Sequence, residues 1–100
     1  MPDQQPKDLP LTQGKEEVFN ELVNGASGTR VVRIRYRDSS GNVSERSIEP
    51  YEFKNGKLFA YDTEKQAIRS FKIESIMSAL RESDTYEPRF PVLIDTSMRV

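Results

Sequence analysis

After its first quarter, the chain consists of short runs of alternating apolar and polar residues separated by turn formers. In the run TRVVRIRYR, Val32, Ile34 and Tyr36 share one face, and arginines occupy the other. The loop DSSGN and the dipeptide Asn55-Gly56 are hairpin signals, the dipeptide being the stronger. Short strands joined by tight turns restrict the fold to a small barrel or a strongly bent antiparallel sheet.

The alternation predicts five or six strands. Pro50 limits the junction after the second strand to a bend or an edge position, because proline has no N–H to donate. A single tight helical turn is expected at IESI, before the last strand. The expected strands are 29–37, 43–48, 51–53, 57–62, 67–72 and 77–82.

One amphipathic helix is predicted ahead of the strands, from about Thr12 to Asn24. Thr12 fits the N-cap position, and Gly25 suits the end of a helix. Residues 1–11 include three prolines and are predicted to be disordered. We divide the rest into a helix and linker (12–27), the strand-rich domain (28–82) and a tail (83–100), which we expect to form an edge strand or a dimer contact. The apolar stripe of the helix comprises Leu11, Val18, Phe19, Leu22 and Val23.

The composition excludes most catalytic sites. Without Cys there is no disulfide, thiol nucleophile or thiolate zinc site, and without His there is no imidazole base or metal ligand. The carboxylates of YDTEK lie in a turn, and Glu49 and Glu52 flank a proline turn, so neither group forms a convincing site. We expect a protein that is not an enzyme and has no metal or cofactor.

The mean hydropathy of −0.70 and the lack of a long apolar run argue against a membrane span. No basic-then-apolar signal pattern opens the sequence, so we predict a cytoplasmic protein.

Charge is unevenly distributed in a chain whose net charge is −1: residues 28–82 hold eleven bases and eight acids, which gives +3. Arg33, Arg35 and Arg37 form a basic stripe on one face of a strand. This stripe reads either as a solvated face balanced by Glu45 or as a track for backbone phosphates.

Two further arginines are placed unusually, because each shares a strand face with a core residue. Arg46 lies two positions before Ile48, and Arg69 two before Phe71. One interpretation is structural: the arginines form ion pairs at a partly buried end of the sheet. The candidate partners are Glu49 or Glu52 for Arg46, and Glu74 or Asp62 for Arg69.

The other interpretation is a pocket for an anion. Guanidinium groups bind phosphate or carboxylate bidentately and stack on bases, and a tyrosine adds a flat surface with a hydroxyl group. Such a pocket would suit a ligand that contains phosphate and a base. Its predicted residues are Tyr36, Arg46 and Arg69, with Lys57 and Lys72 at the rim.

The segment from residue 30 to 76 resembles the WYL domain, a small SH3/Sm-like barrel of bacterial regulators. The resemblance rests on five landmarks in order: IRY (34–36), GN (41–42), RSIEP (46–50), KLFAYD (57–62) and RSFKIESI (69–76). The sequence departs from the family pattern at the Trp-Tyr-Leu triplet, where Gly56 and Lys57 replace the two aromatic residues and Leu58 is kept. Lys72 replaces the usual second arginine of the last motif.

The resemblance implies a mainly β fold, namely a five- to six-stranded SH3/Sm-like barrel preceded by one helix. It also implies a ligand-sensing module that binds a nucleotide or single-stranded DNA or RNA and acts in transcription regulation, phage defence or CRISPR systems. The family's pocket positions map onto Tyr36, Arg46, Arg69 and Lys72, and less directly onto Lys57.

A different class of function stays open. An SH3-like interaction or dimerisation module would bind a protein partner or a second copy through the helix at 12–24 and the apolar tail at 90–94. The loss of the aromatic triplet favours this alternative.

Overall fold

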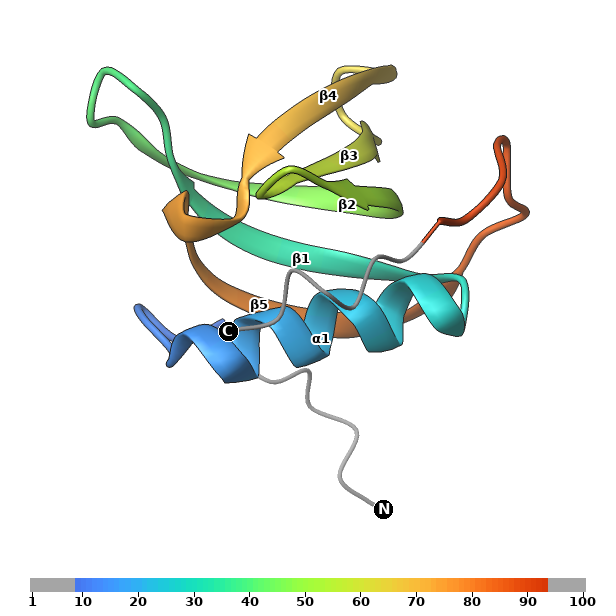
Figure 1. Cartoon of the computed structure of the whole chain (residues 1–100), viewed down its shortest axis with the longest axis horizontal. Helices are drawn as coiled ribbons and strands as arrows, with labels where there is room; N and C mark the ends of the chain where they lie inside the picture. The colour runs from blue at the N-terminus through green and yellow to red at the C-terminus, as the bar shows by residue number, and fades with distance from the viewer. Residues whose placement is uncertain (1–8, 94–100) are drawn as a thin grey trace.

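The structure, a computed structural model, describes residues 9–93. One helix precedes five antiparallel strands in a single sheet of order β4-β3-β2-β1-β5 (Figure 1). The predicted mainly β fold with one leading helix is therefore confirmed. Within the described residues β4 and β5 form the two edges and do not pair, so the sheet is not a closed barrel. The elements are α1 (Lys15–Ser27), β1 (Arg30–Arg37), β2 (Val43–Lys54), β3 (Lys57–Asp62), β4 (Ala67–Lys72), the 3-10 turn η1 (Ile73–Ser75) and β5 (Ile76–Thr85).

The open sheet is strongly curled. The rings of Tyr36 on β1 and Phe71 on β4 meet edge to face at 4.9 Å, although β2 and β3 lie between those strands in the sheet. The short turn η1 joins one edge strand directly to the other. The sheet therefore has a concave inner face, which holds the core.

Helix α1 lies along β5 and β1 and covers part of this inner face (Figure 1). The alternation in β1 is confirmed, since Val32 and Ile34 are buried in the core while Arg33 and Arg35 face outward. The core cluster comprises Val18, Phe19, Leu22 and Ala26 of the helix with Val32, Ile34, Ile48, Phe53, Leu58, Ala60, Phe71, Ile76 and Ala79 of the sheet.

The helix bounds differ from the prediction by three residues at each end. Gly14, and not Thr12, is the N-cap, and Leu11 lies outside the helix with its side chain exposed. Gly25 lies inside the helix, where an added Cβ would overlap the side chain of Val32. This glycine therefore serves close packing of helix on sheet and does not end the helix.

The predicted second and third strands are one long strand, β2. Pro50 lies within it, at a shift of register between Pro50 and Glu52, and proline is tolerated at such a bulge. Strand β1 pairs with residues 43–48 only, whereas β3 pairs with residues 48–54. The second half of β2 therefore has an edge that β1 leaves free.

The chain after β5 turns back and covers that edge; we call residues 86–93 the return segment. The N–H of Leu93 donates to the carbonyl of Tyr51 (2.7 Å), and the N–H of Phe53 donates to the carbonyl of Leu93 (3.1 Å). Leu93 thus forms an isolated parallel bridge with Glu52. Ile94, which was predicted to belong to an apolar tail at 90–94, lies outside the described residues.

Aromatic rings hold the return segment against β2. Tyr51 is buried, and its ring packs edge to face on Tyr86 (5.5 Å) and on Phe90 (5.3 Å). The hydroxyl of Tyr86 donates a hydrogen bond to the carbonyl of Pro50 (2.7 Å). The segment is therefore packed against β2 through Leu93.

At the other end, Leu9 and Pro10 pack near the outer side of β1 and β5. The carbonyl of Pro10 accepts hydrogen bonds from Arg35 Nε (3.3 Å) and Ser78 Oγ (2.6 Å). The remaining residues of the predicted disordered segment that precede these two lie outside the described range. In residues 9–93, the helix is neither long nor apolar enough for a membrane span.

The partly buried Tyr86 makes the fold sensitive to alkaline pH. Burial raises the pKa of Tyr86 above its usual 10.0. A pKa that is higher in the folded protein than in the unfolded chain gives stability that is complete below pH 10 and is lost as the pH rises further. Tyr86→Phe should cost about 1 kcal/mol at neutral pH through the lost hydrogen bond. Between about pH 9 and about pH 11.5, the free energy of unfolding should fall less for Tyr86→Phe than for the wild type. Urea unfolding at both pH values measures the free energy of unfolding. An equal fall in the variant and the wild type would contradict the raised pKa of Tyr86.

Candidate functional site

The inner face carries a polar group at the border of the core, which we call the arginine cluster: Tyr36, Arg46, Asp62, Arg69 and Phe71. Cross-strand pairing brings these residues together from four strands. Arg46 lies opposite Ile34, and Arg69 lies opposite Ala60, so both arginines share a face with core residues. The sequence prediction of their inward placement is confirmed.

Asp62 is the centre of this cluster and is fully buried. Its Oδ2 lies 3.2 Å from Nη1 of Arg46 and 3.8 Å from Nη1 of Arg69. Its Oδ1 accepts hydrogen bonds from the backbone N–H groups of Glu64 (3.0 Å) and Lys65 (3.1 Å). A buried carboxylate is tolerated only when it is paired and hydrogen-bonded, and here both oxygens are engaged.

The two arginines therefore share one carboxylate. The predicted pairing of Arg69 with Asp62 is confirmed, but the predicted pairing of Arg46 with Glu49 or Glu52 is wrong. Those glutamates come after Ile48 on β2, and Glu49 faces the opposite side of the sheet, where it binds Arg89. Asp62 lies across from Ile48 and is within reach of Arg46.

The two guanidinium groups differ in exposure. The side chain of Arg46 is 19% exposed, and its Nε is 3.3 Å from Ser44 Oγ, to which it donates a hydrogen bond. The side chain of Arg69 is 40% exposed, and its guanidinium carbon lies 5.9 Å from the ring centre of Phe71. Arg46 is thus fixed, whereas Arg69 stands at the border with solvent.

The charges in the cluster do not balance. Asp62 is the only carboxylate of the described residues within 4.0 Å of either guanidinium, so two positive groups face one negative group. Each guanidinium has five N–H donors in a planar fork, more than Asp62 can accept. The partly buried ring of Tyr36, which packs on the buried Phe71, lies at the same border, so the surface suits an anion that also has a flat apolar part.

Lys57 and Lys72 lie elsewhere. They face each other across β3 and β4, and both are exposed. Leu58 and Ala60 of β3 point into the core, so strand alternation puts Lys57 and its partner on the outer face. The structure therefore does not bring the two lysines to the arginine cluster, and their role in ligand binding stays a prediction.

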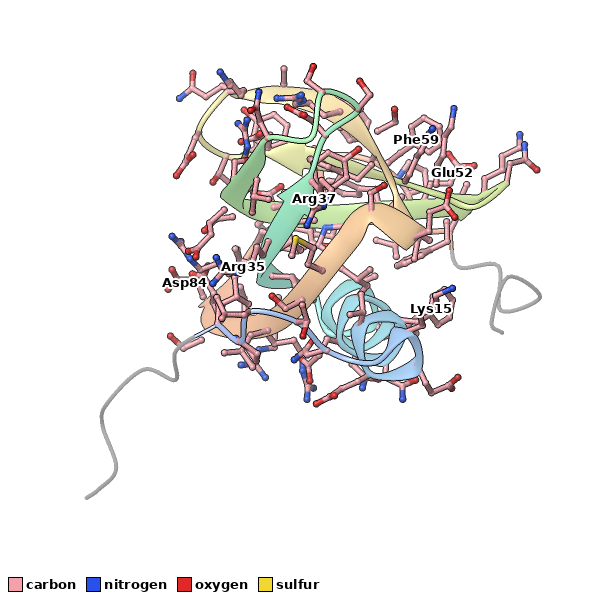
Figure 2. All side chains as sticks on the ribbon, turned by 90° about the vertical axis from the view of Figure 1, so that its left-hand side faces the viewer. Lys15, Arg35, Arg37, Glu52, Phe59 and Asp84 are labelled. Atoms are coloured by element: carbon pink, nitrogen blue, oxygen red, sulfur yellow. The ribbon has the colours of Figure 1, made fainter. Side chains whose placement is uncertain are left out.

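The basic stripe of β1 lies on the outer face as well. Arg33 and Arg35 both pair with Glu45, at 3.2 Å and 2.9 Å, as the solvated-face interpretation predicts. Arg35 also binds the carbonyl groups of Leu9 and Pro10. Figure 2 shows Arg35 beside the N-terminal segment, on the opposite flank from Glu52 and Phe59. Of the stripe, Arg37 is the most exposed member.

Sequence reasoning did not identify Asp62 as the shared partner of both arginines. The available signal was positional, because Asp62 continues the inward series of Leu58 and Ala60 just before a turn. It also missed the pair of Glu49 with Arg89, whose partners are 40 positions apart. Within residues 9–93, no group of three or more acidic side chains is arranged to hold a metal ion.

The comparisons with known proteins bear on the family and the fold. The family model of the WYL domain matches residues 17–81, which include the whole arginine cluster. Among solved structures, proteasome accessory factor B/C (PafBC) of Arthrobacter aurescens superposes with a TM-score of 0.64 at 20% identity. The match covers 83% of this chain but only 14% of that one, so it shows a shared fold over a small part of a longer protein. The search of curated proteins gives no match.

The burial of Asp62 leads to a stability prediction with a matched control. Asp62→Asn should destabilise the protein by about 3 kcal/mol, because it leaves two inward guanidinium groups without a counter-charge. Glu45→Gln also removes a carboxylate that pairs two arginines, but the Glu45 side chain is 34% exposed, so the loss should cost less than about 1 kcal/mol. Urea unfolding at neutral pH compares the two. Equal costs would show that Asp62 is not the centre of the cluster.

Proposed function

The chain belongs to the WYL domain family, and on this premise we propose that it is a ligand-sensing module that binds a nucleotide or a single-stranded nucleic acid at the arginine cluster. In this proposal the module has no catalytic activity. It passes the presence of the ligand on to a system of transcription regulation or of phage defence. The proposal combines the family expectation with the arrangement of the described residues.

The observation that carries the proposal is that two guanidinium groups share a single carboxylate, that of Asp62. One buried carboxylate orients two guanidinium groups, and the surplus of N–H donors and of positive charge is left for a further anion. Holding the arginines in place beforehand lowers the entropy that a ligand's phosphate must overcome on binding. Arg69, the more exposed of the two, would make the first contact with this phosphate.

The aromatic residues support a ligand with a base or a sugar next to the phosphate. Tyr36 is partly buried, and its ring meets Phe71 edge to face. The guanidinium of Arg69 near Phe71 offers a second flat surface on which a base could stack. These surfaces have no base-specific geometry, so we expect tolerance of sequence.

The alternative function as an interaction module has weaker support. The apolar residues of α1 that it would present, Val18, Phe19 and Leu22, are buried against the protein's own sheet. Phe90 and Leu93 belong to the return segment, which is bound to β2.

Fluorescence anisotropy of labelled single-stranded DNA and RNA across a salt series tests the proposal. Two variants probe the cluster: Arg69→Ala, and Arg46→Ala combined with Asp62→Asn so that no lone buried carboxylate remains. Each should weaken binding and reduce the slope of log Kd against log salt by about 0.7 for each lost phosphate contact. Thermal unfolding of each variant confirms that it is folded.

Lys57→Ala/Lys72→Ala is the matched control, because it removes two positive charges from the outer face. It should retain binding within about threefold, since these lysines act only through long-range attraction. Labelled nucleoside triphosphates serve as the second probe if oligonucleotides do not bind. Loss of binding in the lysine variant with full binding in both arginine variants would contradict the proposal.

A further inference from the structure

The outer face of the sheet carries a second group of polar side chains, which is distinct from the arginine cluster. It is formed by Glu49 and Tyr51 of β2 and Tyr61 of β3; we call it the Glu49 recess. Glu49 and Tyr61 are cross-strand partners on the face opposite Ile48 and Asp62. Glu49 and Tyr51 are both buried.

Arg89 of the return segment fills this recess. Its Nε and Nη2 donate to the two carboxylate oxygens of Glu49 (3.1 Å and 3.4 Å), and its guanidinium carbon lies 4.0 Å from the ring centre of Tyr61. The hydrogen bond to Glu49 raises the pKa of Arg89. A carboxylate fork below a ring selects guanidinium over ammonium, because only the planar group satisfies both contacts.

The recess also binds the backbone around the arginine. The hydroxyl of Tyr51 donates to Glu49 (2.9 Å) and accepts the N–H of Arg89 (2.9 Å). Phe90 packs on the ring of Tyr51, and Leu93 pairs with the free edge of β2. Side-chain anchors combined with strand pairing are the way in which protein domains recognise extended peptides.

The two sides of this contact are unequally buried. Glu49 and Tyr51 are almost inaccessible, whereas the side chains of Arg89, Phe90 and Leu93 are each about half exposed. Without an occupant, Glu49 would lose its cation, and the carbonyl of Tyr51 and the N–H of Phe53 would lose their protein partners. The return segment therefore completes the polar contacts of the recess, while its own side chains stay half exposed.

We propose that the Glu49 recess is a binding site for an extended peptide bearing an arginine followed by an aromatic residue, and that the return segment occupies it as an internal ligand. A partner protein with such a segment would compete for the recess and release the return segment. The proposal does not depend on the anion-binding function, since the two sites lie on opposite faces of the sheet.

Binding of a fluorescein-labelled peptide with the sequence of residues 86–93 to the full chain tests this. In the Arg89→Ala/Phe90→Ala variant the internal ligand is weakened, and the peptide should bind at least about tenfold more tightly than to the wild type. Adding Glu49→Gln to this variant should weaken binding by about tenfold or more, through loss of the charged hydrogen bonds. The peptide with Arg89→Lys should bind less well than the unchanged peptide, and the peptide with Arg89→Ala should bind least well.

A second variant covers the case in which the first does not fold. Phe90→Ala/Leu93→Ala keeps the ion pair between Arg89 and Glu49 and loosens the rest of the segment, so it should bind the peptide more tightly than the wild type does. Failure of every folded variant to bind the peptide would overturn the proposal. Equal binding of the arginine, lysine and alanine peptides would overturn it as well, because the recess would then not recognise guanidinium.

Discussion

The buried carboxylate of Asp62 is the interaction on which the inner face of the sheet depends. It lies at the end of β3, accepts two backbone N–H groups of the following turn, and binds arginines of β2 and β4. One side chain thus connects a hairpin turn to three adjacent strands. Without its charge, Arg46 and Arg69 would be two neighbouring cations at the border of an apolar core, which is unfavourable. The same charge holds both guanidinium groups ready for a ligand.

Alternation along the strands separates the charges of this small domain into two faces. Glu45, whose side chain is 34% exposed, pairs with two outer arginines, whereas the fully buried Asp62 has to satisfy two inner ones. The same motif, two arginines on one carboxylate, therefore has different consequences on the two faces. On the outer face it contributes little to stability, and on the inner face it organises a site.

The sequence patterns that depend on local periodicity predicted the fold well. Period two located β1 and its core residues Val32 and Ile34, and Asn55-Gly56 located the turn between β2 and β3. The helix bounds were missed because Gly25 is required by tertiary packing on Val32 and not by helix termination. The continuity of β2 through Pro50 was missed because a bulge relieves the restriction that proline imposes.

The candidate site was predictable where it depends on local strand periodicity. The inward placement of Arg46 and Arg69 follows from alternation alone. Their common partner does not, because it depends on the register between β2 and β3, which places Asp62 opposite Ile48. For the return segment, the sequence predicted an edge strand or a dimer contact but not the pair of Arg89 with Glu49, because these residues meet only after the chain has turned back across the sheet.

Side-chain NMR of the arginine Nε–H groups during titration with a short single-stranded oligonucleotide tests the central claim most directly. The signals of Arg46 and Arg69, which both bind Asp62, should shift together and saturate at one ligand concentration. The signals of Arg33 and Arg35, which both bind Glu45, should not shift. Saturating shifts of the outer arginines with unchanged signals from Arg46 and Arg69 would contradict the account.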